Sequence, residues 1–124
     1  MQIREIKLVE LTLAYEIIKQ YMRDLTYKEY EDLIYQMVKE NYRIILLLDE
    51  EKPIIYAGIK IETNLLEKKH IHIYELMTDK SEDKDYYEDQ ILLYLVDYAK
   101  INMCYSILLS RKTNNYDTKI SINR

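Results

Sequence analysis

The order of apolar and polar positions predicts three helices and several short strands. From Ala14 to Leu25 the apolar residues recur at the helical intervals i, i+3, i+4 and i+7. Thr26 and Glu29 have the spacing of a capping box, in which each side chain accepts a hydrogen bond from the other residue's backbone, so a second helix begins there. A third helix over residues 86–100 carries its apolar side on Ile91, Leu92, Leu95, Val96 and Ala99.

Five further segments alternate or run apolar, as strands do: residues 3–8, 43–49, 54–63, 70–77 and 104–109. Short connections join the second, third and fourth of them, which predicts an antiparallel meander. A helix separates the fourth from the fifth, which predicts a parallel pair joined by a right-handed crossover. The order β-α-α-β-β-β-α-β predicts one α+β domain over residues 1–124, with a polar tail over 111–124 that could add a short strand over 118–123.

Size, charge and cysteine content argue against several classes of protein. The 124 residues are 48% apolar, which is enough for one core. The net charge of −4 and the pI near 5.3 argue against a nucleic-acid partner, because such proteins usually carry a basic surface. No apolar run approaches the ~20 residues that span a bilayer, so no membrane is expected. Cys104 is the only cysteine, so no internal disulfide forms, and we expect a cytoplasmic protein.

The motif with the most information lies between residues 76 and 92. Leu76 and Asp79 lie at the end of an apolar strand, and a polar centre separates them from the helix that contains Ile91. This segment resembles the strand-to-helix turn of the GNAT superfamily of acyl-CoA-dependent acetyltransferases, which runs approximately L-V-T-D, three residues, then R-G-x-G-x-G. Other segments resemble the superfamily in the same order, over residues 41–44, 56–61, 62–65 and 74–79. The resemblance covers residues 3–109 and implies the GNAT fold.

The centre of this turn departs from the superfamily pattern. Asp83 stands where the arginine belongs, and Lys84, Tyr86 and Glu88 stand where the glycines belong. In the superfamily, backbone N–H groups at these glycines and at the helix start hold the pyrophosphate of acyl-CoA. Residues 79–89 contain six acids and two lysines, a local charge of −4 that repels a pyrophosphate by ~1 kcal/mol per close pair even in water. We therefore expect that acetyl-CoA binding has been lost, and we assign no cofactor-binding residue.

The end of the chain departs from the superfamily as well. Enzymes of the superfamily usually continue with a helix and two strands, often with an F-Y-x-x-x-G-F segment whose tyrosine serves as general acid. The sequence reaches Arg124 without this pattern, and nothing around Tyr116 matches it. We therefore assign no catalytic residue and expect a C-terminally shortened member. The apolar strand 104–109 would then lack a neighbour, and because the polar tail looks a poor cover, we expect a homodimer.

Other side chains with candidate chemistry have simpler interpretations. His70 and His72 share a strand face and could bind a metal with Glu62 or Glu75, but a polar strand face is the preferred interpretation and no metal is expected. Glu75 is a candidate general base, because the superfamily often places a carboxylate on this strand; a hydrogen-bonded strand residue is preferred. Cys104 lies in an apolar run, which favours a buried and unreactive thiol.

Hypotheses from two different classes of function remain. The preferred one is a pseudoenzyme: a GNAT-fold binding or regulatory module without acetyl-CoA, acting with a protein partner or as a homodimer. The alternative is a divergent N-acetyltransferase that holds acetyl-CoA through main-chain groups near Leu76 and Ile107. A gene product without selected activity is a third hypothesis. The acidic turn favours the first hypothesis over the second.

Overall fold

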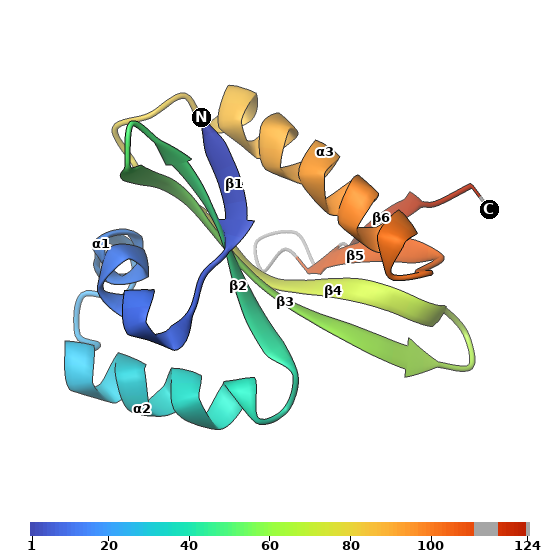
Figure 1. The fold of residues 1–124 in the computed structure, drawn as a ribbon, viewed down its shortest axis with the longest axis horizontal. Helices are drawn as coiled ribbons and strands as arrows, with labels where there is room; N and C mark the ends of the chain where they lie inside the picture. The colour runs from blue at the N-terminus through green and yellow to red at the C-terminus, as the bar shows by residue number, and fades with distance from the viewer. Residues whose placement is uncertain (111–116, 124) are drawn as a thin grey trace.

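The computed structural model describes residues 1–110 and 117–123. Their strands form a single mixed sheet in sequential order (Figure 1): β1 (Gln2–Glu5), β2 (Tyr42–Asp49), β3 (Lys52–Asn64), β4 (Lys68–Thr78), β5 (Ser106–Ser110) and β6 (Asp117–Ser121). The helical elements are η1 (Leu8–Glu10), α1 (Leu11–Tyr21), α2 (Tyr27–Val38) and α3 (Lys84–Ile101). Neighbouring strands are antiparallel except for β4 and β5, which are parallel. The predicted α+β class, the meander and the parallel pair are confirmed.

The sheet is covered on both faces, by α3 on one and by α1 and α2 on the other (Figure 1). Strand β2 lies between the two helical layers, and its residues contribute alternately to the two cores. Ile45 and Leu47 pack on the α3 side, whereas Ile44 and Leu46 pack on the side of α1 and α2. Burial on both faces explains why β2 is continuously apolar rather than alternating.

The capping box at the start of α2 forms as expected. The Thr26 hydroxyl accepts from the backbone N–H of Glu29, and the Glu29 carboxylate accepts from the backbone N–H of Thr26. The end of α3 places its left-handed residue at Met103, one position after the C-cap Asn102. Met103 has a φ of 61°, and the Asn102 side chain donates to the Tyr98 carbonyl oxygen at 2.8 Å.

The short strand considered over 118–123 forms, so β5 does not lack a neighbour. Strand β6 pairs with it in antiparallel register, with Ile120 opposite Ile107. The polar tail is an adequate cover because only one of its faces packs on the core: Ile122 is buried, and Ile120 packs against the α3-side core. The homodimer stays a prediction, without the open strand edge as its argument. Tyr116 lies outside the described residues. Within the described ranges, no helix is both long enough and apolar enough to cross a membrane.

Candidate functional site

Strand β4 parts from β5 halfway along its length. The two strands pair from His70 to Ile73, whereas β4 continues to Thr78. At the point of separation β4 has a bulge, because Gly58 of β3 pairs with Glu75 while the next residue of β3 pairs with Ile73. The bulged residue is Tyr74, and a bulge bends its strand and increases the local twist. The second half of β4 is therefore paired with β3 and leaves β5.

A buried hydrogen-bonded group lies directly beside this bulge. The Tyr42 hydroxyl donates to the Glu75 carboxylate, and the hydroxyl oxygens of Tyr42 and Tyr56 lie 2.6 Å apart. Both tyrosines are only 1% exposed. Burial is the main reason that the pKa of each tyrosine lies far above its usual value of 10, so both hydroxyls keep their protons. Glu75 thus lies in a fixed network of neutral donors, half-buried rather than free on the surface.

Gly58 makes this network possible. It is the only glycine of the chain. A Cβ at this position would overlap the Tyr42 hydroxyl and the Glu75 carboxylate, and would lie 2.5 Å from Cζ of Tyr42. The patterns in the sequence do not assign Tyr42 or Tyr56 to a site. A single glycine inside a strand was the available signal, because such a glycine often marks a close approach of another group.

A small pocket opens between this network and the two N-terminal helices. Its volume is about 190 Å³. Its walls are Ile18, Met22, Leu25, Tyr30, Leu33, Ile34, Met37, Tyr42, Tyr56 and Glu75. The volume is below the roughly 300 Å³ at which small-molecule sites begin, so the pocket suits a small apolar group. Glu75 is the acid of this lining, and a carboxylate there can accept a hydrogen bond or a proton from a bound amine or hydroxyl. The general-base role of Glu75 stays a prediction.

The turn between β4 and α3 is hydrogen-bonded to the protein's own side chains. The Lys80 N–H donates to Oε1 of Gln20 at 2.8 Å, and the Ser81 N–H donates to Oδ1 of Asp79 at 2.9 Å. At the start of the helix, the Tyr86 N–H donates to Oδ1 of Asp83 at 3.3 Å. Acceptors from the chain therefore occupy N–H groups of the kind that would hold a phosphate.

The charges around this turn are also paired within the protein. Lys52 reaches across from β3 and lies 3.1 Å from the Glu82 carboxylate and 3.9 Å from that of Asp79. The hydrogen bond from the Ser81 side chain is the main reason that the pKa of Asp79 lies below its usual value, with a smaller effect of the Lys52 charge. The hydrogen bond to Glu82 likewise raises the pKa of Lys52. Asp79 is therefore ionised at neutral pH, and the nearby lysine already has two carboxylates as partners.

The four residues in the expected arginine and glycine positions lie at the beginning of α3. Asp83 is the N-cap, and Lys84 is the first helical residue. The side chain of Tyr86 is 52% exposed, and Glu88 is half-buried. The start of α3 is therefore capped by the protein's own aspartate, Asp83.

The histidines and the cysteine that the sequence offered as candidates lie apart from the turn and from the pocket. His70 and His72 lie beside Glu62 of β3, whereas Glu75, the other acid considered with them, bonds to Tyr42. Cys104 is fully buried, as its apolar surroundings predicted.

Comparison with known proteins identifies the fold and nothing finer. No family model and no curated protein matches the sequence. Solved structures do match. Glucosamine-6-phosphate N-acetyltransferase of Arabidopsis thaliana superposes with a TM-score of 0.70 at 18% identity, over 99% of this chain and 96% of that enzyme.

Two further structures support the same conclusion. Aminoglycoside 6′-N-acetyltransferase of Acinetobacter haemolyticus gives a TM-score of 0.74 at 12% identity, over 93% of this chain and 82% of the other. A proposed acetyltransferase of Agrobacterium tumefaciens gives 0.76 at 18% identity, over 92% and 83%. The protein therefore has the fold of the GNAT N-acetyltransferases. The expected loss of the cofactor turn and the C-terminal shortening stay predictions.

Proposed function

We propose that this protein is a GNAT-fold binding or regulatory module that does not use acetyl-CoA. The observation that carries the proposal is the turn between β4 and α3. A pyrophosphate there would have to displace Gln20, Asp79 and Asp83 from three N–H groups. At Ser81 and Tyr86 the exchange offers little net gain, because the present acceptors are already carboxylates and a hydrogen bond to a charged group contributes about 1.5–3 kcal/mol in either case. The net negative charge of residues 79–89 then repels the pyrophosphate.

The pocket beside Glu75 supports the binding role. Its apolar walls and its volume of about 190 Å³ suit one side chain of a partner rather than a cofactor. A partner that also presents a hydrogen-bond donor would find an acceptor in the Glu75 carboxylate. The network that holds Glu75 needs no cofactor, because Tyr42 and Tyr56 stay protonated donors and orient it.

Calorimetric titration with acetyl-CoA at physiological salt tests the proposal. We expect no saturable binding below about 1 mM, which corresponds to less than about 4 kcal/mol of binding free energy. A dissociation constant in the low micromolar range would overturn the proposal, because the turn would then accept a pyrophosphate despite its own carboxylates.

A variant that restores the superfamily pattern tests whether this turn is the reason that acetyl-CoA does not bind. It combines Asp83→Arg, Lys84→Gly, Tyr86→Gly and Glu88→Gly, and we expect acetyl-CoA to bind at least about tenfold more tightly, or ~1.4 kcal/mol. The charge changes at Lys84 and Glu88 cancel, so its net charge rises by the two units that Asp83→Arg adds. Asp97→Arg, on an exposed position of α3, adds the same charge away from the turn and is the matched control. Equal gains in both variants would mean that overall charge, and not this turn, limits binding.

The second candidate function is a divergent N-acetyltransferase. The specific observation in its favour is the separation of β4 from β5 after Ile73, with Glu75 just beyond the bulge. An acyl chain could bond to main-chain groups of β4 in that opening without the turn. This function predicts tight acetyl-CoA binding by the unchanged protein and acetyl transfer that Glu75→Gln abolishes, so the same titration separates the two proposals.

A further inference from the structure

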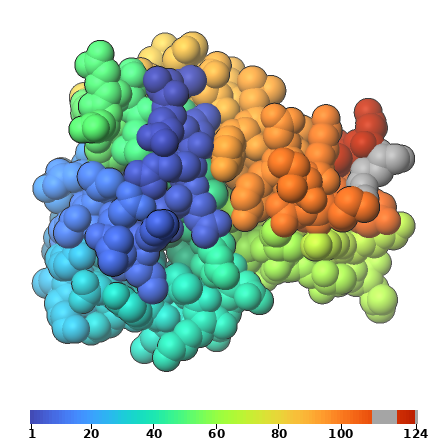
Figure 2. All heavy atoms as spheres, viewed as in Figure 1, coloured from blue at the N-terminus to red at the C-terminus, as the bar shows by residue number. Residues whose placement is uncertain are grey.

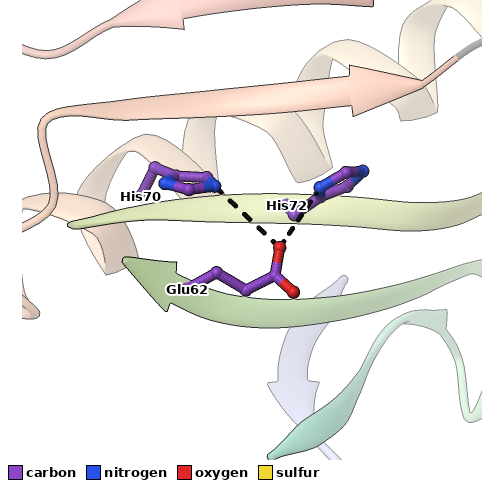
Figure 3. Close-up of side chains that lie close together, drawn as sticks. All are labelled: Glu62, His70 and His72. Carbon is purple, nitrogen blue, oxygen red and sulfur yellow. Dashed lines mark ion pairs between the residues drawn. The ribbon is translucent and has the colours of Figure 1, made fainter. Parts of the chain in front are cut away.

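A group of three potential metal ligands lies on β3 and β4, close to the hairpin that joins them (Figure 3). Glu62 of β3 is paired directly with His70 of β4, and His72 follows on the same face of β4. Oε1 of Glu62 lies 3.3 Å from Nδ1 of His72 and 3.9 Å from Nε2 of His70. All three ligand atoms lie within 4.8 Å of one another.

The hydrogen bond at Nδ1 of His70 determines which tautomer its neutral ring adopts. Nδ1 of His70 lies 2.8 Å from the Lys68 carbonyl oxygen, which can only accept, so this nitrogen carries the hydrogen. In the neutral ring, Nε2 then presents a lone pair to the Glu62 carboxylate, which is also an acceptor. Two acceptors that face each other can share a bound cation, and the His70 ring that supplies one of them is only 2% exposed and is held in place by its neighbours.

Tyr74 holds the other two ligands in place. Its hydroxyl donates to Oε2 of Glu62 at 2.7 Å, on the carboxylate oxygen that does not face the histidines. Its ring stacks on the His72 ring with 4.0 Å between centroids and 11° between planes. Burial and the hydrogen bond to Glu62 raise the pKa of Tyr74 to about 12, so the hydroxyl stays a donor at neutral pH. Hydrogen bonds of this kind, from groups around the ligands, orient metal ligands in known sites.

Two lysines near the group are paired with other carboxylates. Lys60, which is opposite His72, lies 3.6 Å from Glu40. Lys119 of β6 lies 2.8 Å from Glu67, whose pKa is lowered mainly by this contact. The contacts of these two lysines lie with Glu40 and Glu67, whereas the Glu62 carboxylate faces the two imidazole rings. The hairpin end of β3 and β4 projects beyond α1 and α2 in the space-filling view (Figure 2), and Glu62 and His72 are 36% and 22% exposed, so an ion can enter.

We propose that Glu62, His70 and His72 bind a divalent transition-metal ion of the zinc type. Two imidazoles and one carboxylate suit zinc, and three protein ligands leave a fourth position for water. Ligand atoms about 2.1 Å from a tetrahedral zinc are roughly 3.4 Å apart, so the observed 3.3 Å and 3.9 Å require only small side-chain movements. The bound ion joins β3 to β4 near their hairpin. This proposal is independent of whether acetyl-CoA binds.

The test is a zinc titration of the metal-free full-length protein against a chromogenic chelator. We expect one ion per chain. Glu62→Gln and His72→Gln should each weaken binding by tenfold or more, since each removes a ligand. Tyr74→Phe, which removes only the supporting hydroxyl, should weaken it by about tenfold, at the low end of the 10- to 100-fold effects of such groups. Glu16→Gln changes an exposed carboxylate of α1 away from the group and should leave the affinity unchanged.

The thermal midpoint is the second measurement, and circular dichroism confirms that each variant is folded. Zinc at 100-fold excess over its dissociation constant should raise the midpoint of the unchanged protein and not that of Glu62→Gln. The proposal is wrong if the unchanged protein binds zinc no more tightly than the folded Glu62→Gln variant. It is also wrong if Glu16→Gln weakens binding as much as Glu62→Gln, because the ion would then not depend on this group. His70 is left unchanged because its burial makes a folding defect the expected result of its removal.

Discussion

Gly58→Ala should destabilise the protein by the loss of the Tyr42 network rather than by any change in strand propensity. The added Cβ would overlap the Tyr42 hydroxyl and the Glu75 carboxylate and would lie 2.5 Å from Cζ of Tyr42. The Tyr42 ring is 1% exposed and cannot move into solvent. The ring and the carboxylate must therefore shift, and both hydrogen bonds of the Tyr42 hydroxyl are broken.

The size of the effect follows from three contributions. Overpacking a buried site costs about 1–3 kcal/mol. The two lost hydrogen bonds add about 1 kcal/mol each. Replacing glycine restricts the unfolded chain, which returns about 0.4–1 kcal/mol. The free energy of unfolding should fall by about 2–4.5 kcal/mol, which most single domains survive because their total is ~5–15 kcal/mol.

Urea unfolding at 25 °C, followed by circular dichroism, measures this loss. Tyr42→Phe alone should cost about 1–3 kcal/mol, because Glu75 and Tyr56 each lose a partner. In the Tyr42→Phe background both hydrogen bonds of the hydroxyl are already absent, so Gly58→Ala should cost about 2 kcal/mol less than it does alone. A cost of Gly58→Ala below about 0.5 kcal/mol, or additivity of the two changes within ~0.5 kcal/mol, would refute the reasoning.

Two further predictions concern the ends of β1 and β2. The hydrogen bonds from Arg4 hold the pKa of Glu10 at about 2, below its usual 4.5, so the pair stabilises the protein above pH 4.5 and loses its effect as the pH falls through 2. Glu10→Gln should therefore lower the unfolding free energy at pH 7 by up to ~1 kcal/mol and leave it unchanged at pH 2, as measured by urea unfolding. The two-residue turn after β2 places Glu50 and Glu51 at φ values of 50° and 67°, which L-residues disfavour. The double change Glu50→Asn and Glu51→Gly should raise the thermal midpoint by roughly 3–5 °C, and an unchanged midpoint would contradict the strain.

The local pattern of apolar and polar residues was enough to predict the helices, the strands and most of the strand pairing. Helical spacing and strand alternation are short-range properties, and a capping box such as that of Thr26 and Glu29 is complete within four residues. Loop length then selects the pairing, because short loops allow only antiparallel neighbours and a helical crossover gives a parallel pair. The class, the order and the mixed sheet therefore followed from the sequence alone.

The tertiary structure decided which side chains meet. Alternation alone places His70, His72 and Tyr74 on one face of β4 and Glu75 on the other. The bulge at Tyr74 adds one residue and returns Glu75 to the histidine face, where it meets Tyr42, 33 positions earlier in the chain. The same pairing with β3 places Glu62, and not Glu75, beside the two histidines.

The choice between the two possible covers of β5, a strand over 118–123 and a second subunit, was also beyond the sequence. The tail that forms β6 is polar, and its composition predicts a poor partner for an apolar strand. Backbone hydrogen bonds need no apolar side chains, and Ile120 and Ile122 on one face suffice to complete the core. A strand's own sequence specifies which face it buries, whereas its neighbour is selected by the hydrogen-bonding groups that the rest of the sheet leaves open.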